Sequence, residues 1–299
     1  MDQASKLREL VFEQMIKRIE NLEKNTKKKE EFMHIIAIAS GKGGVGKSNV
    51  AINVGIALAD FGKRVTILDA DFGLANIDIL LGLVPEHNLH HVLFGDMSIS
   101  DISIDGPRGT KIIPAGSGIK QMAELTEELK HKLLNNFGHL NYNTDVLIID
   151  AAAGISSNVI DILMASGEIV IVTTPDPTAI TDAYSIIKVI LKENFNKKIK
   201  LVVNSVRTPE DADQIYKQIN NATKKFLERS IDYLGFVYQD QNLVKSVRQQ
   251  KAVSELYPKS PSSKCFQLLA KKILELDSDI PKTGFLNFFK NILIRRRNR

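Results

Sequence analysis

A glycine-rich run that ends in Lys-Ser has the composition and spacing of a phosphate-binding loop. Residues 41–48 read Gly-Lys-Gly-Gly-Val-Gly-Lys-Ser. The apolar run 34–39 before it predicts a short buried strand, and residues 49–59 after it predict a helix. In that context the glycines let several backbone N–H groups face one anion, and the helix start adds unsatisfied donors and the positive end of its dipole. An ordinary turn does not need Gly-Lys-Ser at this spacing.

This loop predicts a site for a nucleoside triphosphate bound with Mg²⁺. Lys47 is expected to reach the β- and γ-phosphates, and the hydroxyl of Ser48 is expected to lie on the metal. The candidate nucleotide-binding residues of the loop are Gly43, Gly44, Val45, Gly46, Lys47, Ser48 and Asn49.

Aspartates end two further apolar runs. Residues 64–71 predict a buried strand that ends at Asp69 and Asp71, and residues 145–150 predict another that ends at Asp150. Ligands of doubly wound sheets bind at the carboxyl ends of the strands. We therefore expect Asp150 to hold Mg²⁺ through water. Asp69 and Asp71 admit a second interpretation, as capping or solvated aspartates.

Strands that alternate with helices predict an α/β fold, a doubly wound and mostly parallel sheet with helices on both faces. Residues 34–278 carry this alternation and predict one P-loop domain. Before it, residues 1–24 predict an amphipathic helix and residues 25–33 a charged linker. Residues 279–299 form an apolar and basic tail.

The basic character of the chain is concentrated at one end. The 299 residues carry a net charge of +5, yet residues 281–299 hold six basic residues and no acid, which leaves residues 1–280 at −1. This distribution disfavours a broad nucleic-acid-binding face and favours a local anionic partner. The single cysteine, Cys265, excludes an internal disulfide and an all-cysteine metal site, and suits a reducing cytoplasm.

Lys42, directly after the first glycine, makes the loop resemble the deviant Walker A motif KGGVGKS/T of the MinD/ParA ATPases. The resemblance implies that Lys42 acts across an ATP-dependent homodimer, on the phosphates of the facing subunit. Without the resemblance, a solvated surface lysine is an equal interpretation. Residues 69–78 resemble the switch I stretch of MinD relatives, which implies that Asp69 lies near the Mg²⁺ shell and that Asp71 positions the attacking water. Residues 150–154 resemble switch II but lack the proline that the family often has.

The same resemblance assigns the base of the nucleotide. Asn204 ends the predicted strand 199–204, where asparagine reads adenine in the MinD group. Asp240 stands where relatives often carry the aspartate of Pro-Glu-Asp, and it is expected to flank the base. Guanine-specific sites of this fold use N-K-x-D, and residues 196–199 lack the aspartate, which favours ATP over GTP.

The extreme N-terminus resembles the DQAxxLR segment of the FlhG group, MinD-like regulators of flagellar placement and number. In that group the segment activates FlhF, a GTPase related to the signal-recognition particle. The alternative is a helix that packs back on the domain. The matching residues, expected to bind such a partner, are Asp2, Gln3, Ala4, Leu7 and Arg8.

The tail, residues 284–293, predicts an amphipathic helix of about 15 Å, too short to span a bilayer. Its apolar face and trailing arginines fit a helix that lies in an anionic membrane interface, and MinD-type proteins end in a similar targeting helix. The alternative is docking on the body or on a partner. The apolar face consists of Phe285, Leu286, Phe288, Phe289, Ile292 and Leu293.

The sequence thus predicts a slow, Mg²⁺-dependent ATPase switch. Its ATP-bound dimer would bind the cytoplasmic membrane peripherally and reversibly and regulate flagella, with basal-body components as further candidate partners and no nucleic acid. The alternative is a MinD-like cell-division-site or ParA-like partition ATPase, and the near-neutral body and apolar tail speak against partition. A metal-cluster carrier would need a second cysteine, which this chain lacks. In a small-molecule kinase Lys42 would have no role.

Overall fold

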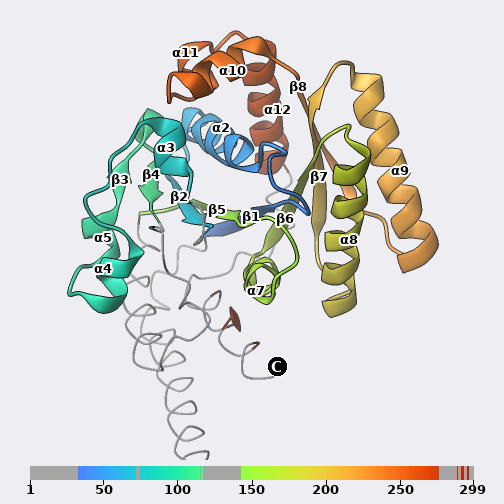
Figure 1. Cartoon of the computed structure of the whole chain (residues 1–299), viewed down its shortest axis with the longest axis horizontal. Helices are drawn as coiled ribbons and strands as arrows, with labels where there is room; N and C mark the ends of the chain where they lie inside the picture. The colour runs from blue at the N-terminus through green and yellow to red at the C-terminus, as the bar shows by residue number, and fades with distance from the viewer. Residues whose placement is uncertain are drawn as a thin grey trace, which may run out of the picture.

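Eight strands of the described chain form one sheet in the order β3-β4-β2-β5-β1-β6-β7-β8 (Figure 1). The computed structural model describes residues 33–71, 75–114, 116, 143–275, 288, 291, 292 and 295. Only β3 runs antiparallel to its neighbour, β4, so the predicted, mostly parallel sheet is confirmed. The strands are β1 His34–Ala39, β2 Val65–Ala70, β3 Ile104–Asp105, β4 Lys111–Ile113, β5 Val146–Ala151, β6 Glu168–Thr173, β7 Ile199–Val206 and β8 Asp232–Tyr238.

Helices cover both faces of this sheet, as the sequence predicts. One core cluster joins the sheet to α2 and α12, and a second joins its other face to α7, α8 and α9. The helices are α2 Lys47–Asp60, α3 Ile77–Leu81, α4 Leu89–Phe94, α5 Ile99–Ile102, α7 Ser157–Ala165, α8 Pro177–Glu193, α9 Pro209–Leu227, α10 Gln241–Arg248, α11 Val253–Leu256 and α12 Pro261–Glu275.

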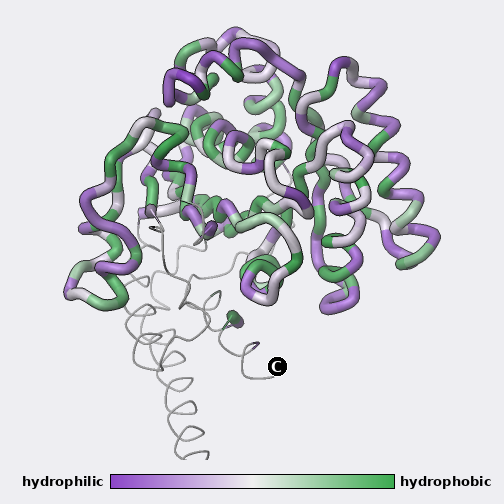
Figure 2. The backbone as a smooth tube through the Cα atoms, viewed as in Figure 1, coloured by the Kyte–Doolittle hydropathy of each residue, from purple (hydrophilic) through white to green (hydrophobic). Residues whose placement is uncertain are grey.

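The central strands are mostly apolar because both faces of the sheet are covered, and their few polar residues lie mainly near the strand ends. Every residue of β1, β2, β5 and β6 is buried. Along β1, Ile36 and Ile38 enter the cluster with α2, while Ala37 and Ala39 enter the opposite cluster, as the twofold alternation of a strand requires. Figure 2 shows hydrophobic residues along the central strands and hydrophilic ones along α9 and α10. The long apolar runs in the sequence are therefore the strands of a doubly covered sheet.

The carboxyl end of β1 lies where the winding of the sheet reverses. From β1 the chain crosses on the α2 face to β2, whereas α7 and α8 cross on the other face to β6 and β7. Neighbouring connections therefore leave the sheet on opposite faces at β1, which opens a crevice at the strand ends. The glycine-rich loop lies at this crevice because it follows β1 directly.

Several predictions concern residues outside this description. The N-terminal helix with Asp2, Gln3, Ala4, Leu7 and Arg8, and the linker before Met33, lie outside the described residues. So do four members of the predicted apolar tail face, Phe285, Leu286, Phe289 and Leu293. Among the helices that the structure describes, none is long and apolar enough to cross a membrane.

A buried charge cluster ties the amino ends of three strands together. Glu168 of β6 is fully buried, and its Oε1 lies 2.7 Å from Nζ of Lys200 in β7. Its other oxygen lies 3.2 Å from Nε2 of His34 in β1. Burial raises the pKa of Glu168, but His34 and Lys200 outweigh it and hold that pKa below its usual value. The cluster fixes the register of the strands whose opposite ends carry the loop, Asp176 and Asn204.

Glu168→Gln should lower the free energy of unfolding by about 3–5 kcal/mol, because it leaves the Lys200 ammonium buried without its counter-charge. Equilibrium unfolding in urea measures the change. Glu275→Gln is the matched control, since Glu275 is 61% exposed and pairs with Lys271 at 3.7 Å; its effect should stay within about 0.5 kcal/mol. Equal effects of the two variants would contradict the role of the cluster.

Candidate functional site

The loop between β1 and α2 has a backbone that suits glycine. Gly44 and Gly46 have positive φ angles of 80° and 86°, which residues with a Cβ rarely adopt. Gly46 is also the N-cap of α2 and offers no side chain to the first N–H groups of the helix, so these donors can face an anion. A Cβ on Gly46 would lie 2.3 Å from Nδ2 of Asn204. Glycine therefore lets the loop lie directly against the end of β7.

The start of the loop packs against α8. A Cβ on Gly41 would lie 2.2 Å from the carbonyl oxygen of Asp182, so no larger residue fits there. The neighbouring Lys42 donates from Nζ to Oγ1 of Thr178 at 2.5 Å, and its Nζ lies 3.7 Å from Oδ1 of Asp176. The Lys42 side chain is 43% exposed, and exposed pairs of this kind contribute at most about 1 kcal/mol. Lys42 is thus held only weakly on the N-terminus of α8.

Lys47 faces the sheet and meets an acid there. Its Nζ donates to Oδ1 of Asp150 at 2.5 Å, and both side chains are buried. Burial raises the pKa of Asp150, while Lys47 and a hydrogen bond from Ser48 act in the opposite direction; the net shift is upward. The loop lysine, the loop serine and the aspartate at the end of β5 therefore form one cluster.

Asp69 lies beside Asp150 because β2 and β5 pair in parallel with these two residues in register. Its Oδ1 accepts from the backbone N–H of Asp71 at 3.0 Å, and its Oδ2 accepts from those of Asn76 and Ile77 at 2.9 and 3.1 Å. Burial, and then the charge of Asp150, raise the pKa of Asp69 to about 6. One carboxylate thus anchors the segment around Asp71 and the start of α3 to the edge of the sheet.

These donors fit Mg²⁺. The carboxylates of Asp69 and Asp150 are both buried and have raised pKa values, so a cation there would relieve their mutual repulsion. Within the described ranges, no group of three or more His, Cys, Asp or Glu side chains could hold a metal. Mg²⁺ suits such a place, because it takes one or two carboxylates together with water and phosphate oxygens. Ser48, Asp150 and, beside them, Asp69 are the residues that would hold it.

Asn204 and Asp240, both expected near the base, have different surroundings. The side chain of Asn204 is nearly buried and donates from Nδ2 to the carbonyl of Val45 at 2.8 Å, within the loop. Asp240 caps α10 and accepts from the N–H and hydroxyl of Ser262 in α12 at 3.1 and 2.7 Å. Asn204 therefore braces the phosphate loop, whereas Asp240 joins α10 to α12.

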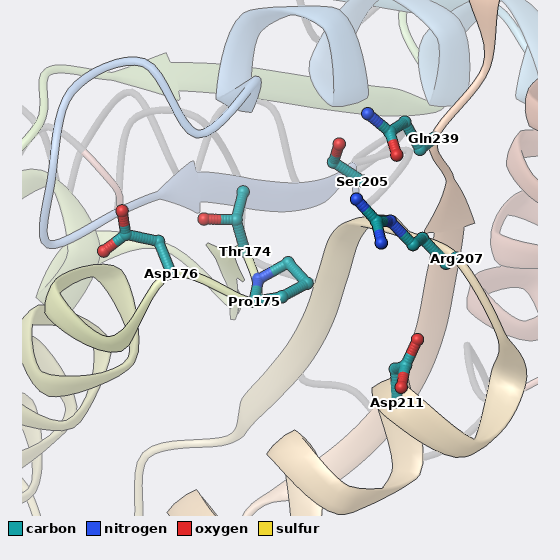
Figure 3. Close-up of a pocket in the computed structure, with 7 residues that line it drawn as sticks. All are labelled: Thr174, Pro175, Asp176, Ser205, Arg207, Asp211 and Gln239. Carbon is teal, nitrogen blue, oxygen red and sulfur yellow. The ribbon is translucent and has the colours of Figure 1, made fainter.

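A cavity of about 550 Å³ opens beside this site, at the carboxyl ends of β6, β7 and β8 (Figure 3). None of its lining residues is among the site residues predicted from the sequence, and Ser205, Arg207 and Gln239 lie nearest in sequence to predicted ones. Ser205 and Arg207 follow Asn204 within three residues and Gln239 directly precedes Asp240, and this proximity is the signal that could have found them. Ser205 has a positive φ of 60°, at a bulge between β7 and β8. The complete lining is Thr174, Pro175, Asp176, Ser205, Arg207, Asp211 and Gln239.

The structure brings most of the predicted site residues to one edge of the sheet. Asp71 follows β2, and its negative charge acts on the carboxylate of Asp150. Lys42 lies apart from this acidic group, on α8. The remaining site residues gather at the loop and the strand ends: Gly43, Gly44, Val45, Gly46, Lys47, Ser48, Asn49, Asp69, Asp150 and Asn204. Of the tail, Phe288 and Ile292 are described, and both are buried.

Comparisons with known proteins agree with this geometry. A profile of the ParA family, described as NUBPL iron-transfer P-loop NTPase, matches residues 31–274. Antiactivator FleN of Pseudomonas aeruginosa is 36% identical over 263 residues, 88% of this chain and 94% of FleN. Flagellum site-determining protein YlxH of Helicobacter pylori is 34% identical over 264 residues, 86% of this chain and 89% of YlxH.

Solved structures show the same fold. The cell division ATPase MinD of Pyrococcus furiosus superposes with a TM-score of 0.64 at 25% identity, over 81% of this chain and 99% of MinD. The septum site-determining protein MinD of Pyrococcus horikoshii, solved in complex with Mg-ADP, gives 0.64 at 24% identity, over 82% of this chain and 97% of that protein.

Mg²⁺-dependent ATP binding should weaken as the pH falls through about 6, because protonation of Asp69 removes negative charge beside Asp150 and one acceptor of the backbone N–H groups. Titration with ATP and Mg²⁺ at several pH values measures the effect. Asp69→Asn should bind more weakly and lose this pH step. A wild-type affinity that is flat between pH 7 and 5 would contradict the assignment.

Protonation of Asp69, which should weaken ATP binding, should at the same time raise the free energy of unfolding. The folded-state pKa of Asp69, about 6, exceeds the ordinary value of 3.8, so the folded protein takes up the proton first. The contribution of Asp69 to the free energy of unfolding should therefore rise by up to about 3 kcal/mol as the pH falls from above 6 towards 4. Comparing the free energies of unfolding of wild type and Asp69→Asn at the same pH values isolates this contribution. If the difference between the two proteins does not change with pH, the raised pKa of Asp69 is refuted.

Gly46→Ala should destabilise the nucleotide-free protein by about 1–3 kcal/mol, because the new Cβ meets the Asn204 amide at a positive φ. Gly43→Ala is the matched control in the same loop, since a Cβ there meets nothing within 4 Å, and it should change stability by less than about 0.5 kcal/mol. Thermal unfolding compares the two. A Gly46→Ala protein as stable as Gly43→Ala would disprove the close contact.

Proposed function

This chain belongs to the ParA family of P-loop NTPases and is an ATPase, and we propose that it acts as an ATP-dependent dimeric switch that regulates flagella. ATP and Mg²⁺ are its ligands in this proposal. The dimer forms when ATP is bound, the C-terminal helix then binds an anionic membrane surface, and slow hydrolysis returns the protein to the monomer. The N-terminal segment carries the output to an SRP-type GTPase.

One observation carries the proposal: the loop has two lysines with different partners. Lys47 points to Asp150 in its own site, whereas Lys42 is exposed and rests on Thr178. A weak, exposed contact is easily exchanged for a phosphate. Lys42 is therefore suited to the phosphates of a facing subunit, while Lys47 serves those of its own.

The chain's own residues supply most of the chemistry in this proposal. The N–H groups of the loop and the start of α2 bind the phosphates, and Lys47 orients them. Asp71, directly after β2, orients the attacking water. Mg²⁺, when bound, would neutralise charge on the β- and γ-phosphates. Asn204 keeps the loop in place through Val45, and it supports recognition of adenine from the same position.

The flagellar assignment rests on the relatives and on the N-terminus. YlxH, at 34% identity, is named for determining the flagellar site, and residues 2–8 match the activator segment of the FlhG group. Asp2, Gln3, Ala4, Leu7 and Arg8 are the residues proposed to contact the GTPase. The relation to the cell division ATPase MinD makes a role at the division site the second candidate. A deletion strain with altered flagella and normal septa would favour the first candidate.

Other activities find less support in the residues. The profile description mentions iron transfer, which needs several soft ligands for a cluster or metal. This chain has one cysteine, Cys265, and it is buried in α12. We therefore do not extend that activity to this protein.

Lys42→Ala should bind ATP normally yet fail to dimerise with it, because its charge serves the facing subunit. Lys47→Ala should lose ATP binding itself, since the lysine serves its own phosphates. Fluorescent-nucleotide titration and light scattering after size exclusion separate the two effects. A Lys42→Ala protein that dimerises like wild type in ATP would reject the switch.

Asp71→Ala should bind ATP and dimerise but hydrolyse at least about tenfold more slowly, because water positioning matters mainly in the transition state. Phosphate release under single-turnover conditions measures the rate. Asp105→Ala, at an acid of β3 whose side chain is 81% exposed, is the control and should hydrolyse at the wild-type rate. Normal turnover of Asp71→Ala would remove Asp71 from the mechanism.

A further inference from the structure

Two phenylalanines are exposed together at the C-terminal ends of α8 and α9. Phe195, two residues after α8, is 49% exposed, and Phe226, in the last turn of α9, is 65% exposed. Arg229 joins the two ends, because it follows Phe226 by three residues and its guanidinium carbon lies 5.6 Å from the centre of the Phe195 ring. Both helices cover the same face of the sheet, towards its β8 edge (Figure 1). The two rings therefore belong to one surface.

Cations accompany both rings. Nζ of Lys225 lies 5.3 Å from the centre of the Phe226 ring, as Arg229 lies over Phe195. Residues 192–198 and 224–230 hold six basic and two acidic residues, a net charge of +4. One of the two acids, Glu193, is already paired with Arg295 at 2.6 Å. The surface is thus both apolar and positive, and we call it the aromatic patch: Phe195, Phe226, Lys225 and Arg229.

The two rings contribute little to the protein's own core. The hydrophobic cluster that joins α8 and α9 to the sheet takes in Leu227, whereas Phe195 and Phe226 stay outside it. A cation over an exposed ring is a weak contact, so it does not by itself account for a phenylalanine at either position. Single exposed apolar residues are ordinary, but two large rings with cations beside them form a patch that suits a ligand.

We propose that the aromatic patch is a contact between the folded body of the protein and an anionic lipid surface, in addition to the C-terminal helix. This inference rests on the proposed membrane function. Aromatic rings suit the boundary between headgroups and acyl chains, and lysine and arginine beside them can stay at the phosphates. The position favours lipid over an acidic protein, because Arg295 of the C-terminal segment contacts Glu193, two residues before Phe195.

The aromatic patch lies away from the nucleotide edge of the sheet. Helices α8 and α9 begin at that edge, where Thr178 contacts Lys42 and Asp211 lines the cavity. The helices are 17 and 19 residues long, so their C-terminal ends lie roughly 25–28 Å farther on. Lipid bound at the patch would therefore leave the nucleotide site free. Together with the C-terminal helix, a second contact would fix the orientation of the body on the membrane and raise the apparent affinity.

Phe226→Ser in the full-length, ATP-bound protein tests the patch. Sedimentation with vesicles of phosphatidylcholine and phosphatidylglycerol should show an apparent affinity about tenfold below wild type, because one ring no longer enters the boundary. Lys225→Glu should also weaken binding to these vesicles, and its difference from wild type should vanish on pure phosphatidylcholine. A fluorophore on Asn196→Cys, an exposed position next to Phe195, should be quenched by lipids that carry a nitroxide on the headgroup.

Phe94→Ser is the matched control, because Phe94 is 44% exposed and lies on α4, on the β3 side of the sheet (Figure 1). It should bind vesicles as wild type does, and all variants should bind ATP normally. Equal losses in Phe94→Ser and Phe226→Ser would reject the patch, since any exposed ring would then have the same effect.

Two further outcomes separate the patch from the membrane function. If wild type binds vesicles, Phe226→Ser and Lys225→Glu bind equally well and the fluorophore at position 196 is not quenched, the patch is rejected while the membrane function stands. An acidic protein would then be the better candidate ligand for these residues. If ATP-bound wild type binds no vesicles, the membrane function fails, and the lipid contact of the patch with it.

Discussion

The buried contact between Lys47 and Asp150 joins the phosphate-binding loop to the end of β5, and the rest of the site is arranged around it. A lysine and an aspartate that leave water lose hydration free energy, which only a close contact and further hydrogen bonds recover. Ser48 supplies one such bond to Asp150. The apolar strands can therefore end in charges without destabilising the sheet. The same contact places Lys47 beside the expected phosphates and the carboxylate of Asp150 beside the expected Mg²⁺, where a nucleotide bound with Mg²⁺ would need both.

Two other groups of contacts preserve this arrangement. Asp69 uses both oxygens to hold the backbone N–H groups of Asp71 and, at the start of α3, of Asn76 and Ile77, so these residues are attached to the sheet next to Asp150. At the opposite ends of β1, β6 and β7, Glu168 with its two partners fixes the strand register. The charged residues at the amino ends of the strands thus align the strands with one another. The charged residues at the carboxyl ends are the ones suited to a nucleotide and its metal. Helix α8 links the two functions, since its first residues hold Lys42 and its last residue, Glu193, holds Arg295.

Much of this architecture could be predicted from the sequence, for physical reasons. Apolar runs that end in Asp69, Asp150 and Asn204 indicate parallel strands, and the carboxyl ends of such strands meet at one edge. The sequence could not reveal which partner each polar side chain takes. Asp240, for example, joins α10 to α12 through Ser262, a contact that no motif announces. Arg207 and Gln239 line the cavity but have no motif of their own. Arg295 lies close to both Asp161 and Glu193, and only the tertiary structure brings these three residues together.

In the proposed switch, Lys42 exchanges its contact with Thr178 for one across the dimer when ATP binds. A crystal structure of Asp71→Ala with ATP and Mg²⁺ would reveal this exchange, because slow hydrolysis would preserve the complex. We expect a twofold dimer in which Nζ of Lys42 has left Thr178 and contacts the phosphates bound to the facing subunit. An ATP-bound structure in which Lys42 still donates to Thr178, with no phosphate of a partner near it, would rule the exchange out.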